Sequence, residues 1–253
     1  MSISRRSFLG LIPVVPFLSS AQPSPPASKN PRFPSHDDES VREIVGVSHG
    51  NLAHVKEMVT ARPALARASW DWGFGDWETP IDAASHVGNR AIAEFLIANG
   101  ARPTIFTAVM MGQLSIVKSL VESSPGLQRL RGPHGLTMVA HAKAGGSAAL
   151  DVLKYLESLG DADPRYPDVP LTEAEQASII GEYSFGPGPS ERFNVAKGPR
   201  GFTIQRPGGA ERNLFHHGGL VFNPPGAEAV LIKFEGDTVA VEDGPLITRA
   251  RRI

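Results

Sequence analysis

Apolar and polar positions alternate at helical spacing through the first two thirds of the chain, and glycine interrupts the pattern at intervals. Amphipathic runs lie on both sides of Gly50, Gly88, Gly112 and Gly146. Glycine there ends one helix and allows a tight turn into the next. A pair of short helices has too little apolar surface to be stable alone, so the pattern predicts a stack of helix pairs. The residues expected to be buried in the stack are Ile44, Val55, Met58, Ile81, Ile92, Leu96, Ile116, Leu120, Val152 and Leu156.

The start of the stack has a capping signal. Ser40 is followed three positions later by Glu43, which is the spacing of a capping box, and three acidic residues at 37–39 precede it. We therefore expect the first helix to begin at Ser40.

The second helix pair carries the most specific motif. It opens with Thr79–Ala84, Thr-Pro-Ile-Asp-Ala-Ala, and closes with Leu96–Ala101, Leu-Ile-Ala-Asn-Gly-Ala. These segments resemble an ankyrin repeat, with Asp82 in place of the usual histidine, and the fourth pair, from Gly135, matches more loosely. The resemblance implies a solenoid of about four repeats over residues 38–165, with loops that project towards protein partners.

The periodicity changes after a proline-rich link. Thr172 to Glu175 predicts the start of a short helix that ends near Gly181. Short β-type runs separated by glycine and proline then follow. They cover 182–185, 192–195, 202–205, 220–222 and 230–234. The predicted fold class is therefore α+β and multidomain: an all-α repeat solenoid followed by a small all-β domain over 171–253, either an antiparallel sheet or a barrel.

Three segments of this β region, Gly181–Tyr183, Phe222–Pro224 and Val230–Glu235, resemble the accessory module of penicillin-binding-protein-like serine hydrolases. The resemblance implies an accessory role. A small barrel can also hold one ligand, so a small-ligand site in this domain stays open as an alternative.

The N-terminus resembles a twin-arginine export signal. Arg5 and Arg6 precede a short apolar run over 9–18, and small residues at 19–21 offer a cleavage site. A basic tail without a targeting role is the alternative. The resemblance implies removal of residues 1–21, export to the periplasm or beyond, and no membrane attachment afterwards. Five prolines predict a disordered linker over 22–37.

Composition removes several classes of function. The chain has no cysteine, which excludes disulfides, zinc-thiolate sites and cysteine nucleophiles. The formal net charge is −1, and no basic block with interleaved aromatic residues is present, so we expect no nucleic-acid partner.

Catalytic and metal motifs are sparse. Ser115 and Lys118 have the Ser-x-x-Lys spacing, but the partner motifs of that hydrolase group are missing. His-Glu-x-x-His is absent, His49 and His54 are separated by a helix break, and His216 and His217 would point to opposite faces of a strand. We therefore expect no catalytic residue, no cofactor and no metal.

The candidate contact is an aromatic loop before the second helix pair, which contains all three tryptophans of the chain. Aromatic side chains are enriched where proteins bind one another. The candidate partner-binding residues are Trp70, Asp71, Trp72, Phe74, Asp76 and Trp77. The alternative is that these rings cover exposed helix ends, with Trp70 and Trp72 fully buried. The expected function is a non-catalytic, exported scaffold that binds an unidentified protein partner, and the alternative is a small-ligand or hydrolase-associated module centred on the β domain.

Overall fold

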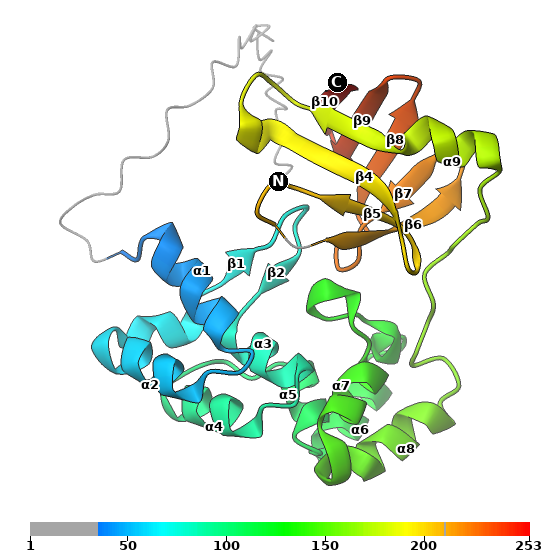
Figure 1. Ribbon diagram of the computed structural model, residues 1–253. Helices are drawn as coiled ribbons and strands as arrows, with labels where there is room; N and C mark the ends of the chain where they lie inside the picture. The colour runs from blue at the N-terminus through cyan, green and yellow to red at the C-terminus, as the bar shows by residue number, and fades with distance from the viewer. Residues whose placement is uncertain (1–34, 210) are drawn as a thin grey trace, which may run out of the picture. The chain divides into compact units, whose positions relative to one another are not determined.

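The computed structural model describes residues 35–209 and 211–253, and helices make up most of the first half of this part (Figure 1). They are α1 (Asp38–Val47), α2 (Leu52–Ala61), α3 (Pro80–His86), α4 (Arg90–Ala98), α5 (Ile105–Met110), α6 (Leu114–Ser123), α7 (Met138–Ala144) and α8 (Leu150–Ser158). Each odd-numbered helix contacts the helix that follows it, and α1, α3, α5 and α7 also contact one another in that order. We call Asp38–Ser158 the helical part.

Side-chain caps define where the inner helices begin. The side chains of Thr79, Thr104 and Thr137 each accept a hydrogen bond from the backbone N–H three residues later, at the starts of α3, α5 and α7. At α1 the expected start was wrong. Asp37, not Ser40, is the N-cap, because its carboxylate accepts from the Ser40 N–H and so stabilises a helix that begins one turn earlier.

Two apolar clusters form the core of the helical part, one around α1–α4 and one around α5–α8. The expected burial of Ile116 and Leu120 was wrong, since their side chains are 47% and 39% exposed. Val117 and Val121, one position further along α6, are buried in their place. Residues four apart share a helix face, so a shift of one position turns the whole apolar stripe.

Two of the turn glycines are required by close packing. Gly88 and Gly112 have φ of +76° and +73°, a region that other residues rarely adopt. A Cβ at Gly88 would overlap the carbonyl oxygen of Ala144, and one at Gly112 would overlap that of Ala148. Neighbouring helix pairs therefore approach one another through backbone contacts that leave no room for a side chain.

The second half is a closed antiparallel barrel, entered through α9 (Glu173–Ile179), which starts after Thr172 as predicted and has a capping box of Thr172 and Glu175. Its strands are β3 (Gly181–Ser184), β4 (Arg192–Gly198), β5 (Gly201–Gln205), β6 (Arg212–Gly218), β7 (Val221–Asn223), β8 (Val230–Glu235), β9 (Thr238–Asp243) and β10 (Leu246–Arg252). Each strand pairs with the next along the chain, and β10 closes the barrel on β3. The α+β class with a β-barrel is thus confirmed.

Apolar side chains fill the barrel interior. Tyr183, Phe222, Ile232 and Phe234 are buried together, and Ile179 of α9 joins them. The Tyr183 hydroxyl donates a hydrogen bond of 2.9 Å to the carbonyl of Ile179, so the polar atom of this ring has a partner inside the core. A barrel of this size is just wide enough for its own side chains.

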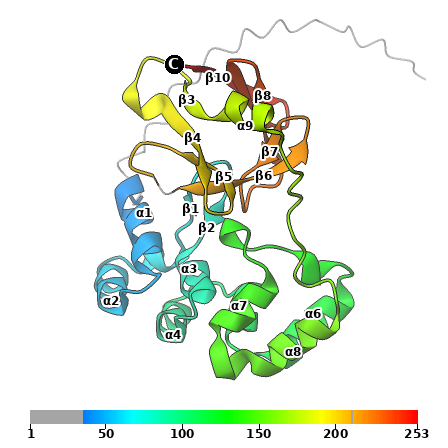
Figure 2. The same ribbon diagram turned by 45° about the vertical axis from the view of Figure 1, so that its right-hand side comes forward.

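The aromatic loop forms a two-stranded hairpin, β1 (Trp70–Asp71) and β2 (Trp77–Glu78), which contacts the barrel. Arg212 of β6 donates hydrogen bonds to the Gly73 carbonyl and to Asp76, and Phe74 packs against the barrel core. His36–Ile253 form one compact unit. Figure 2 shows the hairpin beside α3 on one side and the barrel strands on the other.

Among the described residues, no helix has the length and apolar character needed to cross a membrane. The export signal over 1–21, with Arg5 and Arg6, lies outside the described residues, as does the linker up to residue 34.

Candidate metal centre

Four side chains from separate elements of the helical part converge on one point. His49 lies in the turn after α1, Glu78 in β2, His86 at the end of α3, and His134 in the short 3-10 turn before α7. Each offers one ligand atom, and these four atoms all lie within 4.8 Å of one another.

The spacing of these atoms suits a coordinated ion. The Nε2 atoms of His49 and His86 are 3.0 Å apart, and Glu78 Oε1 lies 2.9 Å from His86 Nε2 and 3.3 Å from His134 Nε2. Ligands about 2.0–2.1 Å from a tetrahedral zinc ion are separated by roughly 3.3 Å. Three imidazole nitrogens and one carboxylate oxygen form a donor set that suits Zn²⁺, Fe²⁺ and similar divalent ions.

Glu78 presents one oxygen to the centre and has the other one held. The indole N–H of Trp72 donates to Oε2 at 2.7 Å. Oε1 is buried and makes no hydrogen bond of acceptable geometry, although His86 Nε2 and His134 Nε2 lie 2.9 Å and 3.3 Å from it. A buried carboxylate oxygen left without a donor is costly, and a cation among the three imidazoles would satisfy it.

The distal nitrogens of two of the histidines are also held. His134 Nδ1 donates to Asp76 Oδ2 at 2.8 Å, and His49 Nδ1 lies 2.9 Å from the backbone carbonyl oxygen of Gly46. Such contacts fix which nitrogen carries the proton, so that Nε2 presents its lone pair to an ion. The outer contacts are those expected around a built metal site.

His134 has an unusual backbone conformation, with φ of +59°. Its backbone N–H and its ring both bond to the carboxylate of Asp76, at 2.8 Å each, which stabilises the left-handed geometry. A non-glycine residue in this region costs of the order of 1–2 kcal/mol. The two hydrogen bonds to Asp76 therefore hold the His134 imidazole in a position that an unstrained turn would not give it.

The ion-free centre has strongly shifted protonation. Burial alone lowers the pKa of His134, but the bonds and charges of Asp76 and Glu78 outweigh burial and raise it to about 9. Burial raises the pKa of Glu78, yet the adjacent His134 and His86 bring it down to about 2. Without an ion, a protonated His134 balances the buried carboxylates, and binding of an ion to its Nε2 displaces that proton.

A fifth histidine lies close behind the centre. The ring centroid of His141 is 6.5 Å from that of His86, and its Nε2 is buried without a partner. Burial lowers the pKa of His141 to about 4, so the ring stays neutral and adds no charge beside the cluster.

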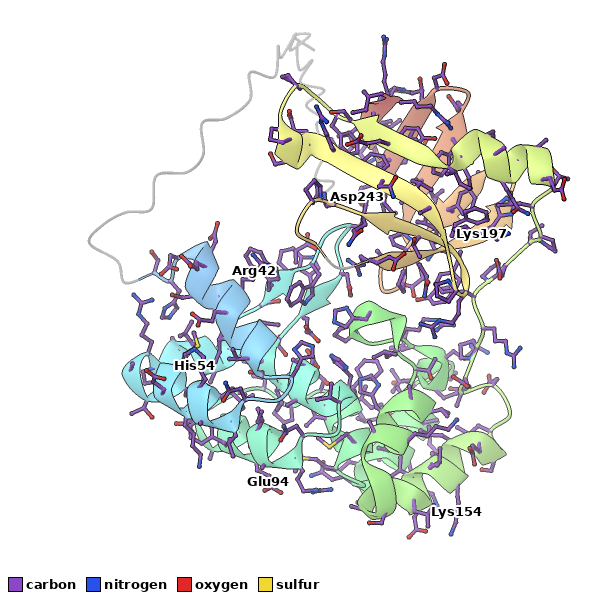
Figure 3. The ribbon with its side chains drawn as sticks, viewed as in Figure 1. Arg42, His54, Glu94, Lys154, Lys197 and Asp243 are labelled. Carbon is purple, nitrogen blue, oxygen red and sulfur yellow. The ribbon has the colours of Figure 1, made fainter. Side chains whose placement is uncertain are left out.

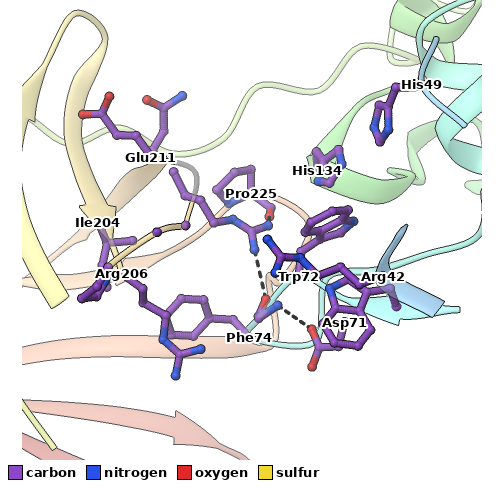
Figure 4. Close-up of a pocket in the computed structure, with 17 residues that line it drawn as sticks. Arg42, His49, Asp71, Trp72, Phe74, His134, Ile204, Arg206, Glu211 and Pro225 are labelled. Atoms are coloured by element: carbon purple, nitrogen blue, oxygen red, sulfur yellow. Dashed lines mark hydrogen bonds between the residues drawn. The ribbon is translucent and has the colours of Figure 1, made fainter. Parts of the chain in front are cut away.

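One side of the centre is accessible. The side chains of Glu78 and His86 are 0% and 9% exposed, whereas those of His49 and His134 are 32% and 30% exposed. His49 and His134 also line a cavity of about 710 Å³ between the hairpin and the barrel (Figure 4). A fifth ligand, beyond the four protein atoms, would therefore enter from this cavity.

No protein-family model, no curated protein and no solved structure matches the chain. The function must be argued from the geometry.

The hairpin residues expected to bind a partner have several different environments. Trp70 and Trp72 are half-buried, pack against the α1–α4 core and line the cavity together with Asp71 and Phe74. Asp76 is 1% exposed and bonds to His134 and Arg212, while Trp77 is 61% exposed. The hairpin thus supports the cluster of three histidines and Glu78 and forms one wall of the cavity.

The cluster was missed in the sequence because its members span 85 positions and form no local motif. One signal was available. His49 and His86 lie within two residues of Gly50 and Gly88, the turn glycines of the first two helix pairs. In a stack of repeats, equivalent turns lie side by side, so these two histidines become neighbours. His134, in the loop before the fourth pair, has no such signal.

Proposed function

We propose that the chain is a metal-dependent enzyme that holds one divalent transition-metal ion with His49, Glu78, His86 and His134. The observation that carries the proposal is the convergence of three imidazole Nε2 atoms on the buried Glu78 Oε1, which makes no hydrogen bond of acceptable geometry. Because the accessible side of the centre opens on a cavity, the ion can bind water or a substrate oxygen there. Such an ion lowers the pKa of bound water or polarises a carbonyl or phosphoryl group, which favours hydrolysis.

The first experiment measures metal content. The full chain, loaded with Zn²⁺ and desalted, should retain one ion per chain by mass spectrometry, and Glu78→Gln should retain far less. Glutamine can still accept the Trp72 hydrogen bond, but it lacks the charge that an ion requires. His54→Ala is the control, since His54 lies on α2 with Glu43 and Glu57 as partners and away from the hairpin (Figure 3).

The second experiment separates an enzyme from a structural metal site. Hydrolysis of aryl ester and aryl phosphate substrates should disappear with a chelator and return with Zn²⁺ or Co²⁺. Equal metal content in wild type and Glu78→Gln would contradict the metal site, and stoichiometric binding without any hydrolysis would contradict the enzyme.

A second function, binding of a protein partner, is supported by Trp77. We propose that the helical part is an ankyrin-like stack, that Trp77 is a contact on it, and that the chain is exported folded through the twin-arginine route. The Trp77 indole is 61% exposed, which is typical of a contact residue, and it has no role in the proposed metal site. Affinity capture from an envelope extract should return a stoichiometric partner, and Trp77→Ala should lose it while metal content stays unchanged.

A further inference from the structure

The cavity beside the metal centre has three apolar rings on its hairpin wall, namely Trp70, Trp72 and Phe74. Ile204 and Pro225 of the barrel region add further apolar surface. In Figure 4, His49 and His134 lie at one end of the cavity, and Arg206 and Ile204 lie at the other. Its volume of about 710 Å³ is in the range of sites for small organic molecules.

Arginines line the cavity, and two of the three are free to act on a ligand. Arg212 is already engaged, because it donates to Asp76 and to the carbonyls of Gly73 and Pro225. Arg42 of α1 and Arg206 after β5 are exposed, and their side chains make no salt bridge or hydrogen bond within residues 35–209 and 211–253. A Cβ added at Gly73 would lie 3.9 Å from Arg206 Nη1, so the Arg206 guanidinium is near the tip of the hairpin.

The two carboxylates of the lining are held by neutral donors. Asp71 accepts from the backbone N–H groups of Gly73 and Gly75, and Glu211 accepts from the hydroxyl of Thr203 at 2.6 Å. The lining contains three arginines and two carboxylates. A divalent ion carries two positive charges against the single charge of Glu78, so a loaded centre adds positive charge at its end of the cavity.

We propose that this cavity binds a small organic oxyanion, a carboxylate or a phosphate ester with an apolar body of about aromatic-ring size. Its oxyanion takes the open position of the ion, its body lies along Trp72 and Phe74, and Arg42 and Arg206 contribute the opposing charge. The inference rests on the proposed metal centre. Without the ion, the oxyanion has no metal position to occupy, so the anion binds only to the loaded protein.

The test uses the full chain loaded with Co²⁺, whose visible spectrum reports changes in coordination. Benzoate and phenyl phosphate are the two anionic probes, benzyl alcohol supplies the ring without charge, and acetate supplies the charge without the ring. We expect at least one aromatic anion to change the spectrum, and to bind roughly tenfold or more tightly than benzyl alcohol or acetate.

Matched arginine variants locate the contact. Arg42→Gln and Arg206→Gln should each weaken anion binding by roughly tenfold and leave Co²⁺ content unchanged. Arg102→Gln in the helical part and Arg249→Gln on β10 change exposed arginines outside the lining and should leave anion binding unchanged. Circular dichroism of each variant confirms that it is folded.

The outcomes separate the two proposals. Absence of Co²⁺ binding overturns the metal centre and this inference together. Co²⁺ binding with no response to either aromatic anion, or equal binding of benzyl alcohol, overturns this inference alone. Equal anion binding with and without Co²⁺ also overturns it, because it would place the anion away from the ion.

Discussion

The helical part and the barrel differ in what they bury. The barrel encloses mainly aromatic and aliphatic side chains, with Tyr183, Phe222 and Phe234 at its centre. The helical part encloses apolar helix faces as well, but at its hairpin edge it also buries Asp76, Glu78 and His141. Buried ionisable groups are costly and concentrate where chemistry occurs. The difference supports the metal centre that we propose in the helical part, and the barrel contributes one wall of the cavity.

The largest expected effect tests whether the barrel is needed for the metal centre. Phe222→Ala should lower the free energy of unfolding by about 3–5 kcal/mol, because it leaves a cavity in the barrel core. Zn²⁺ content measured at low temperature should be unchanged, since all four proposed ligands belong to the helical part. Loss of the ion in this variant would show that the two regions are not separable in this way.

The next effect concerns the close packing of the helix pairs. Gly88→Ala should destabilise the protein by roughly 2–3 kcal/mol in urea unfolding, since it combines a positive φ with overlap against Ala144. Gly146→Ala is the matched control. Gly146 also has positive φ, +63°, but nothing lies within 4 Å of the added methyl group, so its cost should be about 1 kcal/mol. Equal costs would contradict the packing argument.

A pH series distinguishes the polar edge of the helical part from the apolar barrel. In the metal-free protein, the pKa of His134 rises from 6.5 to about 9 on folding, so its stabilising effect is complete below pH 6.5 and is lost towards pH 9. The pKa of His141 falls from 6.5 to about 4, so its neutral burial costs stability as the pH drops from 6.5 to 4. Melting temperature in a chelator should therefore be highest near pH 6.5.

Two controls accompany this series. His134→Gln should remove most of the decrease in melting temperature between pH 6.5 and 9. The raised pKa of His54 contributes to the decrease in the same direction. Bound Zn²⁺ should reduce the same loss, because a coordinated His134 has already given up its proton. If the decrease in melting temperature above pH 6.5 is the same in His134→Gln as in wild type, another group causes it.

The smallest expected effect concerns the exposed face of α6. Ile116→Ala should change the free energy of unfolding by less than about 0.5 kcal/mol, as surface substitutions usually do. Val117→Ala, at the neighbouring buried position, should cost clearly more. Chemical denaturation of the two variants compares them directly.

Local patterns in the sequence predicted much of the fold. The Thr172 cap, the helix pairs around the turn glycines and five of the barrel strands follow from neighbouring residues alone. The strands β6, β9 and β10 were missed. In β10, for example, Leu246 to Arg249 are exposed and alternate less clearly between apolar and polar, so the period of two is weak.

The candidate centre could not be predicted in the same way, because its geometry depends on packing between repeats. In the sequence, Glu78 is one acidic residue in an aromatic loop. Only the fold brings Trp72 and three distant histidines around it. Ile116 and Leu120 show the same limit, since a helical stripe one position out of register is equally plausible from spacing alone. Sequence periodicity indicates which elements form, and tertiary contacts decide which side chains meet.

The carboxylate of Asp76 bonds to His134 on one side and to Arg212 of the barrel on the other. Coordination of an ion by His134 Nε2 would take the proton from this ring and leave Arg212 as the cation opposite Asp76. The ion and the barrel therefore act on one shared group, and their effects on it are reciprocal by thermodynamic necessity. If ion binding strengthens the contact between the hairpin and the barrel by some factor, that contact strengthens ion binding by the same factor.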